Sequence, residues 1–265
     1  MYIHQLKYFY TFAKIKHINM SIIVVKKEEQ AQGSFNNGAI LENKPIGFPQ
    51  DNGVQKAYSN LFYWAHAYST EGSTIGLHPH KGFEIVSYVL KGAIKHYDTK
   101  TDKWWDLEEG DFQVIKSGNG ISHSEELGKD SEIFQIWLDP NLNKSLAKEA
   151  AYMDYKSETL TTESNPNRTI KRIVGENSVV KLDTEGIEML EVSLKENFPM
   201  ALKPDFTYSI YILKGEVQLN QSQLKLNDFA IINDEINIKI EGEKGSKLFI
   251  LSSPKTPTYT TYINS

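Results

Sequence analysis

Two pairs of similar segments repeat along the chain, and this internal repeat constrains the fold more than any other feature of the sequence. Residues 83–94 (FEIVSYVLKGAI) match residues 206–217 (FTYSIYILKGEV), and residues 110–115 (GDFQVI) match residues 227–232 (NDFAII). The matches come in the same order, with a connection that is six residues shorter in the second half. Unrelated β-hairpins can share one such pattern, but two ordered matches predict two domains of similar structure.

Short runs rich in Val, Ile, Tyr and Phe recur along the chain, separated by Gly, Asn, Asp and Lys. Regular short strands with turn residues between them predict an all-β sandwich or barrel. The segment Leu142–Asp154 differs, because its leucines and alanines favour a helix. It lies where a link between the two halves is expected. The clearest strand signals are Phe83–Leu90, Phe112–Lys116, Ile133–Leu138, Met189–Leu194, Tyr208–Leu213 and Phe229–Ile232.

Composition excludes several classes of protein and site. The chain has 265 residues, 40% of them hydrophobic and 24% charged, which suits two packed domains rather than disorder. The absence of cysteine excludes disulfides and zinc–thiolate sites, so a bound metal needs nitrogen and oxygen ligands. The formal net charge of −5, with both signs interspersed, argues against direct binding of nucleic acid.

No apolar stretch approaches the roughly 18 residues needed to cross a bilayer. The N-terminus lacks the unbroken apolar segment of a secretory signal. We therefore expect a cytoplasmic protein without a membrane partner. Met20 is a candidate native start, and on that interpretation residues 1–19 are an extension outside the fold.

Histidines concentrate in the first half of the chain. Five of the seven lie between His66 and His123, in a window that holds the clusters HPH (78–80) and HSEE (123–126). Residues two apart on a strand point to the same face, so His78 and His80 can direct two imidazoles to one point. His123 and Glu125 can do the same from a second strand. These two pairs predict a site for one divalent metal ion with three nitrogen ligands and one carboxylate oxygen.

The repeat supports this interpretation, because the scaffold persists in the second half while the proposed ligands do not. Packing histidines would be expected in both halves. Extending the matches without gaps sets His78, His80, His123 and Glu125 opposite Ala201, Lys203, Ile240 and Gly242, in that order. Glu241 and Glu243 flank Gly242, so an alignment shifted by one residue at this position stays open.

Other polar and aromatic residues near these clusters receive plainer interpretations. Strand alternation from His80 puts Glu84 on the same face, and we interpret it as a partner that orients an imidazole or as a surface charge, rather than as a ligand. His66 and His96 are interpreted as ordinary strand histidines. Trp104–Trp105 is expected in a charged hairpin loop that packs against the barrel.

Residues 76–99 (GLHPHKGFEIVSYVLKGAIKHYDT) and 108–125 (EEGDFQVIKSGNGISHSE) resemble the signature of the pirin family, a branch of the cupin superfamily. The resemblance implies a bicupin, with two antiparallel, jelly-roll-like β-barrels joined by the short helical linker. It implies that His78, His80, His123 and Glu125 bind iron, as Fe(II), in the first barrel. Val114–Gly118 and His96–Thr99 depart from the family pattern at the rim of the pocket, which leaves the substrate open.

The domain division follows from these features. Residues 1–19 form the extension, residues 20–140 the metal-binding cupin domain, and residues 141–265 the linker and a C-terminal cupin domain without metal ligands. The leading functional hypothesis is an iron-dependent dioxygenase acting on quercetin-like flavonols or related enols, in which Glu125 accepts the substrate's proton. The alternative is a non-enzymatic, iron-dependent redox-sensing or regulatory protein with a protein partner. Ligand types alone do not separate iron from nickel, copper, manganese or zinc.

Overall fold

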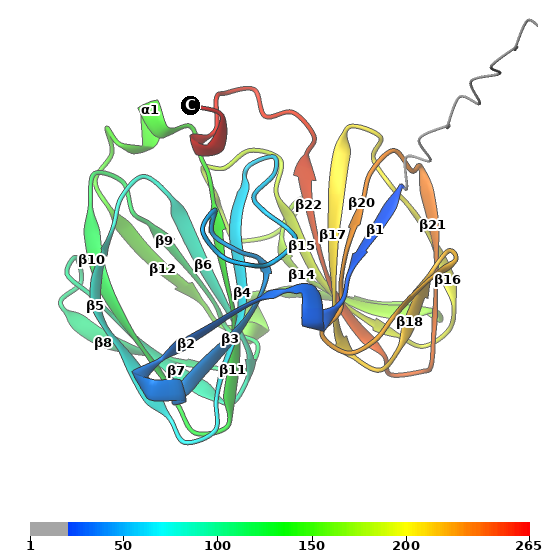
Figure 1. The fold of residues 1–265 in the computed structure, drawn as a ribbon, viewed down its shortest axis with the longest axis horizontal. Helices are drawn as coiled ribbons and strands as arrows, with labels where there is room; N and C mark the ends of the chain where they lie inside the picture. Colours follow the sequence, from blue (N-terminus) through cyan, green and yellow to red (C-terminus); the bar gives the residue numbers. More distant parts are fainter. Residues whose placement is uncertain (1–20) are drawn as a thin grey trace, which may run out of the picture.

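The computed structural model describes residues 21–265 (Figure 1). The predicted extension at residues 1–19 lies outside the described residues. Within the described part, strands dominate and the only α-helix is α1 (Leu142–Ser145). No helix in this part is long and apolar enough to span a bilayer. The short 3₁₀ helices are η1 (Lys27–Glu29), η2 (Asn36–Gly38), η3 (Ser157–Thr159) and η4 (Tyr262–Asn264).

The strands form two halves, each built from one sheet of seven strands and one of four (Figure 1). The large sheet of the first half has the order β12-β9-β6-β11-β4-β3-β2 and the small one β5-β10-β7-β8. The large strands, in chain order, are β2 (Ala31–Phe35), β3 (Ile40–Ile46), β4 (Leu61–Ser69), β6 (Glu84–Lys91), β9 (Phe112–Lys116), β11 (Ser131–Leu138) and β12 (Ala151–Tyr155). The small strands are β5 (Ser73–His80), β7 (Ala93–Asp98), β8 (Lys103–Glu108) and β10 (Ile121–Leu127).

The second half repeats this plan, with the orders β1-β20-β17-β22-β15-β14-β13 and β16-β21-β18-β19. Its large strands are β1 (Ile22–Val25), β13 (Thr161–Ser164), β14 (Arg168–Val174), β15 (Glu188–Leu194), β17 (Phe206–Lys214), β20 (Phe229–Ile232) and β22 (Lys247–Pro254). Its small strands are β16 (Phe198–Ala201), β18 (Val217–Leu219), β19 (Ser222–Leu224) and β21 (Asn237–Gly242). The all-β prediction of two antiparallel, cupin-like halves is confirmed, although hydrogen bonds do not close either barrel in the described chain.

The sequence repeat corresponds to a repeat in strand register. Tyr88 of β6 pairs with Phe112 of β9, and Tyr211 of β17 pairs with Phe229 of β20. Because the matched segments occupy the same place in both sheets, the prediction of two similar domains is confirmed. The six strand signals singled out in the sequence all fall on strands, namely β6, β9, β11, β15, β17 and β20.

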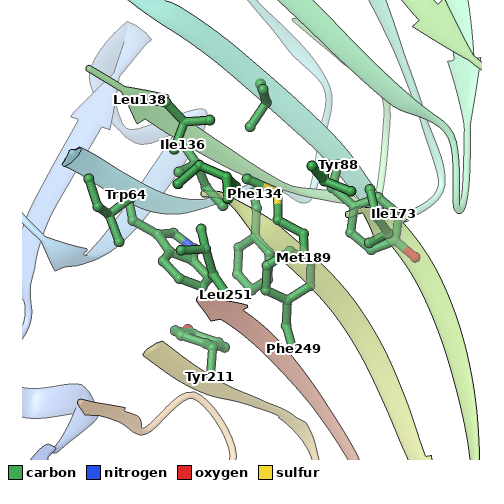
Figure 2. Close-up of a cluster of buried hydrophobic side chains, with 14 of the residues drawn as sticks. Trp64, Tyr88, Phe134, Ile136, Leu138, Ile173, Met189, Tyr211, Phe249 and Leu251 are labelled. Atoms are coloured by element: carbon green, nitrogen blue, oxygen red, sulfur yellow. The ribbon is translucent and has the colours of Figure 1, made fainter. Parts of the chain in front are cut away.

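An aromatic core joins the two large sheets face to face (Figure 2). The Trp64 ring lies 5.2 Å from Phe134 of its own half and 5.5 Å from Phe249 of the other half, measured between centroids. Tyr211 of the second half lies 5.0 Å from Phe134. A buried ring removes roughly 200 Å² from water, which stabilises the fold by about 5 kcal/mol as an upper bound. The two halves therefore form one packed unit.

Strands cross between the halves in both directions. β1, near the start of the described chain, pairs with β20 in the second large sheet. β12, which follows the link, pairs with β9 in the first large sheet. The predicted boundary between residues 140 and 141 stays a prediction. Each large sheet includes one edge strand from the other side of that boundary, β12 in the first half and β1 in the second.

The predicted helix at Leu142–Asp154 is wrong for most of its length. Helix α1 ends at Ser145, and residues 151–155 form the strand β12. Alanine favours a helix only by fractions of a kcal/mol per residue. Pairing with the open edge of β9 satisfies the backbone of five residues at once, so the sheet determines the conformation here.

Candidate metal centre

Three of the four predicted ligands meet where β5 and β10 pair. The antiparallel register sets His123 opposite His78 and Ile121 opposite His80. Strand alternation turns both β5 histidines to the face that His123 shares. The Nε2 atom of His123 lies 2.9 Å from Nε2 of His80 and 3.0 Å from Nε2 of His78. The predicted convergence of two imidazoles from one strand with one from another is thus present.

Glu125 enters the same interior from deeper in β10. The β5–β10 register shifts between His123 and Glu125, and the carboxylate is 1% exposed. Its Oε1 accepts hydrogen bonds from Ser87 Oγ at 2.9 Å and Gln113 Nε2 at 2.7 Å, and its Oε2 accepts one from Gln135 Nε2 at 2.6 Å. Donors on three other strands, β6, β9 and β11, therefore fix this carboxylate.

The three imidazole nitrogens fit a cation better than they fit one another. A neutral Nε2 carries either one proton or one lone pair, so His123 cannot bond to both of its neighbours through that atom. An octahedral ion with bonds of about 2.1 Å holds neighbouring ligand atoms about 3.0 Å apart. The distances of 2.9 and 3.0 Å match that spacing. The residues present therefore fit a divalent metal ion.

The tautomers and protonation states suit metal binding. Nδ1 of His78 donates a hydrogen bond to the Gly76 carbonyl at 2.7 Å, which leaves the lone pair on Nε2. Burial, with a contribution from His78, lowers the pKa of His80 to about 4. Burial, with contributions from the neighbouring histidines, holds the pKa of His123 well below its ordinary value. Near neutral pH the imidazoles of His80 and His123 are therefore uncharged, as ligands must be.

The fourth predicted ligand has a different set of neighbours. His78, His80 and His123 form one group of candidate ligand atoms, and His96, His123 and Glu125 form a second, each within 4.8 Å. Glu125 thus adjoins the three-histidine group through His123, and its direct coordination stays a prediction. His96 lies on strand β7 as expected, is fully buried and belongs to the second group of candidate ligand atoms, so its interpretation as an ordinary strand histidine stays a prediction.

The second half shows that the fold itself does not require these polar groups. By the sequence match, His96 corresponds to Leu219. His96 pairs with Glu125 across β7 and β10, whereas Leu219 pairs with Ile240 across β18 and β21. Strand register therefore places Ile240 at the position of Glu125, two residues from the gap-free alignment. Both counterparts belong to the apolar core of the second half. The same comparison could have found His96 in the sequence.

Glu84 has a different role from either that was predicted. It is 1% exposed and accepts hydrogen bonds from the backbone N–H groups of Asp183 at 2.8 Å and Thr184 at 2.7 Å, and from Thr184 Oγ1 at 2.6 Å. Lys116 Nζ lies 3.4 Å away. Glu84 therefore fastens the loop after β14 to β6, and it neither orients an imidazole nor lies at the surface.

Two further expectations have separate outcomes. His66 contacts Tyr211 Oη at 3.0 Å and Glu132 at 3.2 Å, away from both candidate ligand groups, as expected of a strand histidine. The expected loop position of Trp104–Trp105 is wrong, because both residues lie in β8. The Trp105 ring stacks against the Tyr152 ring of β12, with centroids 5.9 Å apart.

Aromatic side chains border the site on the side of His80. The Trp137 ring is perpendicular to the His80 ring, with centroids 4.7 Å apart. Trp137 Nε1 donates to Gln135 Oε1 at 3.1 Å, and Gln135 in turn holds Glu125. This aromatic wall (Phe48, Phe62, Phe83 and Trp137) is joined by Tyr262 of η4, whose ring lies 5.5 Å from that of Phe62.

Comparisons with known proteins agree with this fold. Residues 53–138 match the family described as Pirin. The chain is 26% identical over 196 residues to the quercetin 2,3-dioxygenase of Escherichia coli O157:H7, covering 69% of this chain and 78% of that protein. It is 25% identical over 179 residues to pirin of Homo sapiens, covering 63% and 61% of the two chains.

Solved structures show the same architecture. The bacterial pirin YhhW from Escherichia coli, in complex with nickel(II), superimposes with a TM-score of 0.73 at 22% identity, covering 88% of this chain and 99% of that one. The matched family, the curated relatives and the shared fold thus confirm the resemblance found in the motifs. The chain therefore carries a pirin-type segment at residues 53–138 and is similar to pirins and quercetin 2,3-dioxygenases over about two thirds of its length.

Proposed function

We propose that this protein is a metal-dependent dioxygenase that acts on quercetin-like flavonols or related enols. His78, His80, His123 and Glu125 are the proposed ligands of one divalent ion, and Fe(II) is the proposed ion. The observation that carries this proposal is the convergence of three Nε2 atoms, with spacings of 2.9 and 3.0 Å, in an interior whose counterpart is apolar. The relative from Escherichia coli named a quercetin 2,3-dioxygenase supports the choice of reaction.

When bound, the ion would supply Lewis acidity, lowering the pKa of a substrate hydroxyl group. Glu125 is the proposed acceptor of that proton, and its buried carboxylate is held by Ser87, Gln113 and Gln135. Because these donors come from three strands of the large sheet, they hold the carboxylate in a fixed position.

The surroundings of the site suit a flat aromatic substrate. The interior end is closed, because His123 and Glu125 are 0% and 1% exposed. The His78 end is half-buried and leads to the surface. The aromatic wall at His80 offers ring faces and edges against which a flavonol would pack. Shielding by these rings would also exclude water from the reacting atoms.

Elemental analysis of the purified protein tests the metal site and identifies the ion. We expect about one iron per chain in the wild type and none in a His78→Ala/His123→Ala variant that keeps its circular dichroism spectrum. Nickel, copper, manganese and zinc use the same ligand types, and nickel(II) is the ion in the Escherichia coli pirin structure. A predominance of another metal would correct the proposed ion without removing the site.

Oxygen consumption tests the reaction. The iron-loaded protein, prepared without oxygen, is mixed with quercetin and then with simpler enols in an oxygen electrode. We expect uptake of oxygen that depends on both metal and substrate. A metal-loaded protein that consumes no oxygen with any flavonol or enol would refute the dioxygenase proposal.

A regulatory, non-enzymatic role is the second candidate, and a surface pocket beside His80 favours it. His80 borders a surface pocket of about 470 Å³ together with Pro79, Lys81 and residues 120–122. A change in the oxidation state of the ion could therefore alter the surface that a protein partner contacts. Binding of a partner only to the oxidised or only to the reduced form, without turnover of substrate, would select this role.

A further inference from the structure

Asp98 determines which ring nitrogen of His96 carries the proton. His96 Nε2 lies 2.9 Å from Asp98 Oδ2, and both side chains are fully buried. Because a carboxylate only accepts, the Nε2–H group must be the donor. The backbone N–H groups of Lys100 and Thr101 donate to Asp98 Oδ1 at 2.8 and 2.7 Å, and these bonds keep the carboxylate in place. The lone pair of His96 is therefore on Nδ1.

Two neighbouring imidazoles each leave one buried nitrogen without a partner. Nδ1 of His96 and Nδ1 of His123 are both buried and make no hydrogen bond with any residue of the described chain. Their rings lie 5.5 Å apart between centroids. An unsatisfied buried polar atom costs about 1–3 kcal/mol, so a pair of them in adjacent rings needs an explanation.

Metal binding would make these two atoms complementary. An ion that takes the lone pair of His123 Nε2 requires the proton of that ring to be on Nδ1. His123 would then offer an N–H group where Asp98 has left a lone pair on His96. Histidine ligands of metals almost always donate their second N–H group to such an acceptor.

The second half provides independent support. The sequence match places Leu219 and Gln221 at the positions of His96 and Asp98. The half without proposed ligands thus lacks the buried His–Asp pair as well. Tyr152 stacks on the His96 ring at 4.3 Å with an interplanar angle of 3°, which fixes the plane of the ring in the first half.

We propose that His96, oriented by Asp98, is the positioning residue for the metal ligand His123, accepting its Nδ1–H directly or through one buried water. The line Asp98–His96–His123 then sets the tautomer and the orientation of the ligand, and with them the affinity for the ion. This inference rests on the proposed metal site but not on the proposed reaction.

Metal affinity in two variants tests the proposal. His96→Phe removes the acceptor but keeps a flat ring for Tyr152. Asp98→Asn keeps the shape, but its amide can donate to His96 Nε2, which would move the proton of His96 to Nδ1 and oppose His123. We expect both variants to bind nickel(II) about 10- to 100-fold more weakly than the wild type. The affinity is measured by competition with a chelator, and His66→Gln is the control for loss of a buried histidine elsewhere.

A spectroscopic measurement separates positioning from a merely structural role. In ¹⁵N-labelled, nickel-free protein loaded with zinc(II), the Nδ1–H of His123 should give a protected imidazole resonance, and Asp98→Asn should shift or abolish it. Should His96→Phe fail to fold, Asp98→Asn alone decides. Equal nickel affinity in Asp98→Asn and wild type would overturn this inference while leaving the metal site intact. A wild type that binds no metal would overturn both.

Discussion

Replacing Glu125 by glutamine separates the charge of the metal centre from its shape. The carboxylate accepts three hydrogen bonds, from Ser87, Gln113 and Gln135. A glutamine amide has one oxygen, which can serve the two donors that now share Oε1. Its NH₂ group then faces Gln135 Nε2, so two donors oppose each other. Turning the Gln135 amide would relieve this contact but would break its bond with Trp137.

The cost in stability follows from that count. One buried donor without a partner costs about 1–3 kcal/mol, which lowers Tm by about 2–12 °C in a chain of this size. Glu125→Gln should remove a larger fraction of the stabilisation that bound metal provides than of the stability of the metal-free protein. Nickel(II) at 100 times Kd would stabilise the wild type by about 2.7 kcal/mol. An uncharged amide is a poorer ligand, so Glu125→Gln should lose most of that stabilisation.

Thermal denaturation with and without nickel(II) measures both effects. Glu126→Gln is the matched control, since this neighbour has a partly exposed side chain that pairs loosely with Lys95 at 4.0 Å. The control should stay within about 0.5 kcal/mol of the wild type in both conditions. If Glu125→Gln is stabilised by nickel(II) as strongly as the wild type, then the carboxylate is no ligand and the proposed set of four is reduced to the three histidines.

Three other substitutions test other parts of the structure. Glu84→Ala should destabilise the protein by about 3–5 kcal/mol without changing metal content, because Lys116 and two backbone N–H groups lose a buried acceptor. A change below about 1 kcal/mol in urea denaturation would contradict the role of Glu84 in holding the loop after β14. Burial raises the pKa of Asp139 to about 6, so its folded form favours the neutral acid, and its contribution to stability is present at pH 4 and lost as pH rises through 6. The Tm advantage of Asp139→Asn over the wild type should therefore grow between pH 4 and pH 7, and a constant difference would count against this assignment. Trp137→Leu should keep its metal but raise KM for quercetin about tenfold, and an unchanged KM would place the substrate elsewhere.

The fold was predictable from local sequence because the repeated segments form the same pairs of strands, in the same register, in both halves. The pairs Tyr88–Phe112 and Tyr211–Phe229 occupy equivalent places, so matching the letters amounted to matching the strands. The segment at 142–154 failed for the opposite reason. Its conformation depends on the free edge of β9, which lies more than thirty residues earlier in the chain, and no local propensity reports that edge.

The candidate site was predictable where its residues are spaced two apart on one strand. The spacing of His78 and His80, and of His123 and Glu125, indicates that each pair shares one face of its strand. His96 did not, because its partners His123 and Glu125 lie across a strand pair, and only its replacement by Leu219 in the repeat gives a signal. Glu84 was misread because the backbone groups that it binds lie about a hundred residues away.

The exchange of β1 and β12 between the halves has a consequence for any attempt to study the metal site in isolation. A fragment ending at residue 140 would lack the last strand of its own large sheet while carrying the first strand of the other. It would present a bare row of N–H and C=O groups along β9, a template for intermolecular pairing. Tyr152, which stacks on the buried His96, would be missing from it as well. Excising the N-terminal half should therefore yield aggregates rather than a minimal metalloprotein, and both halves must be made together.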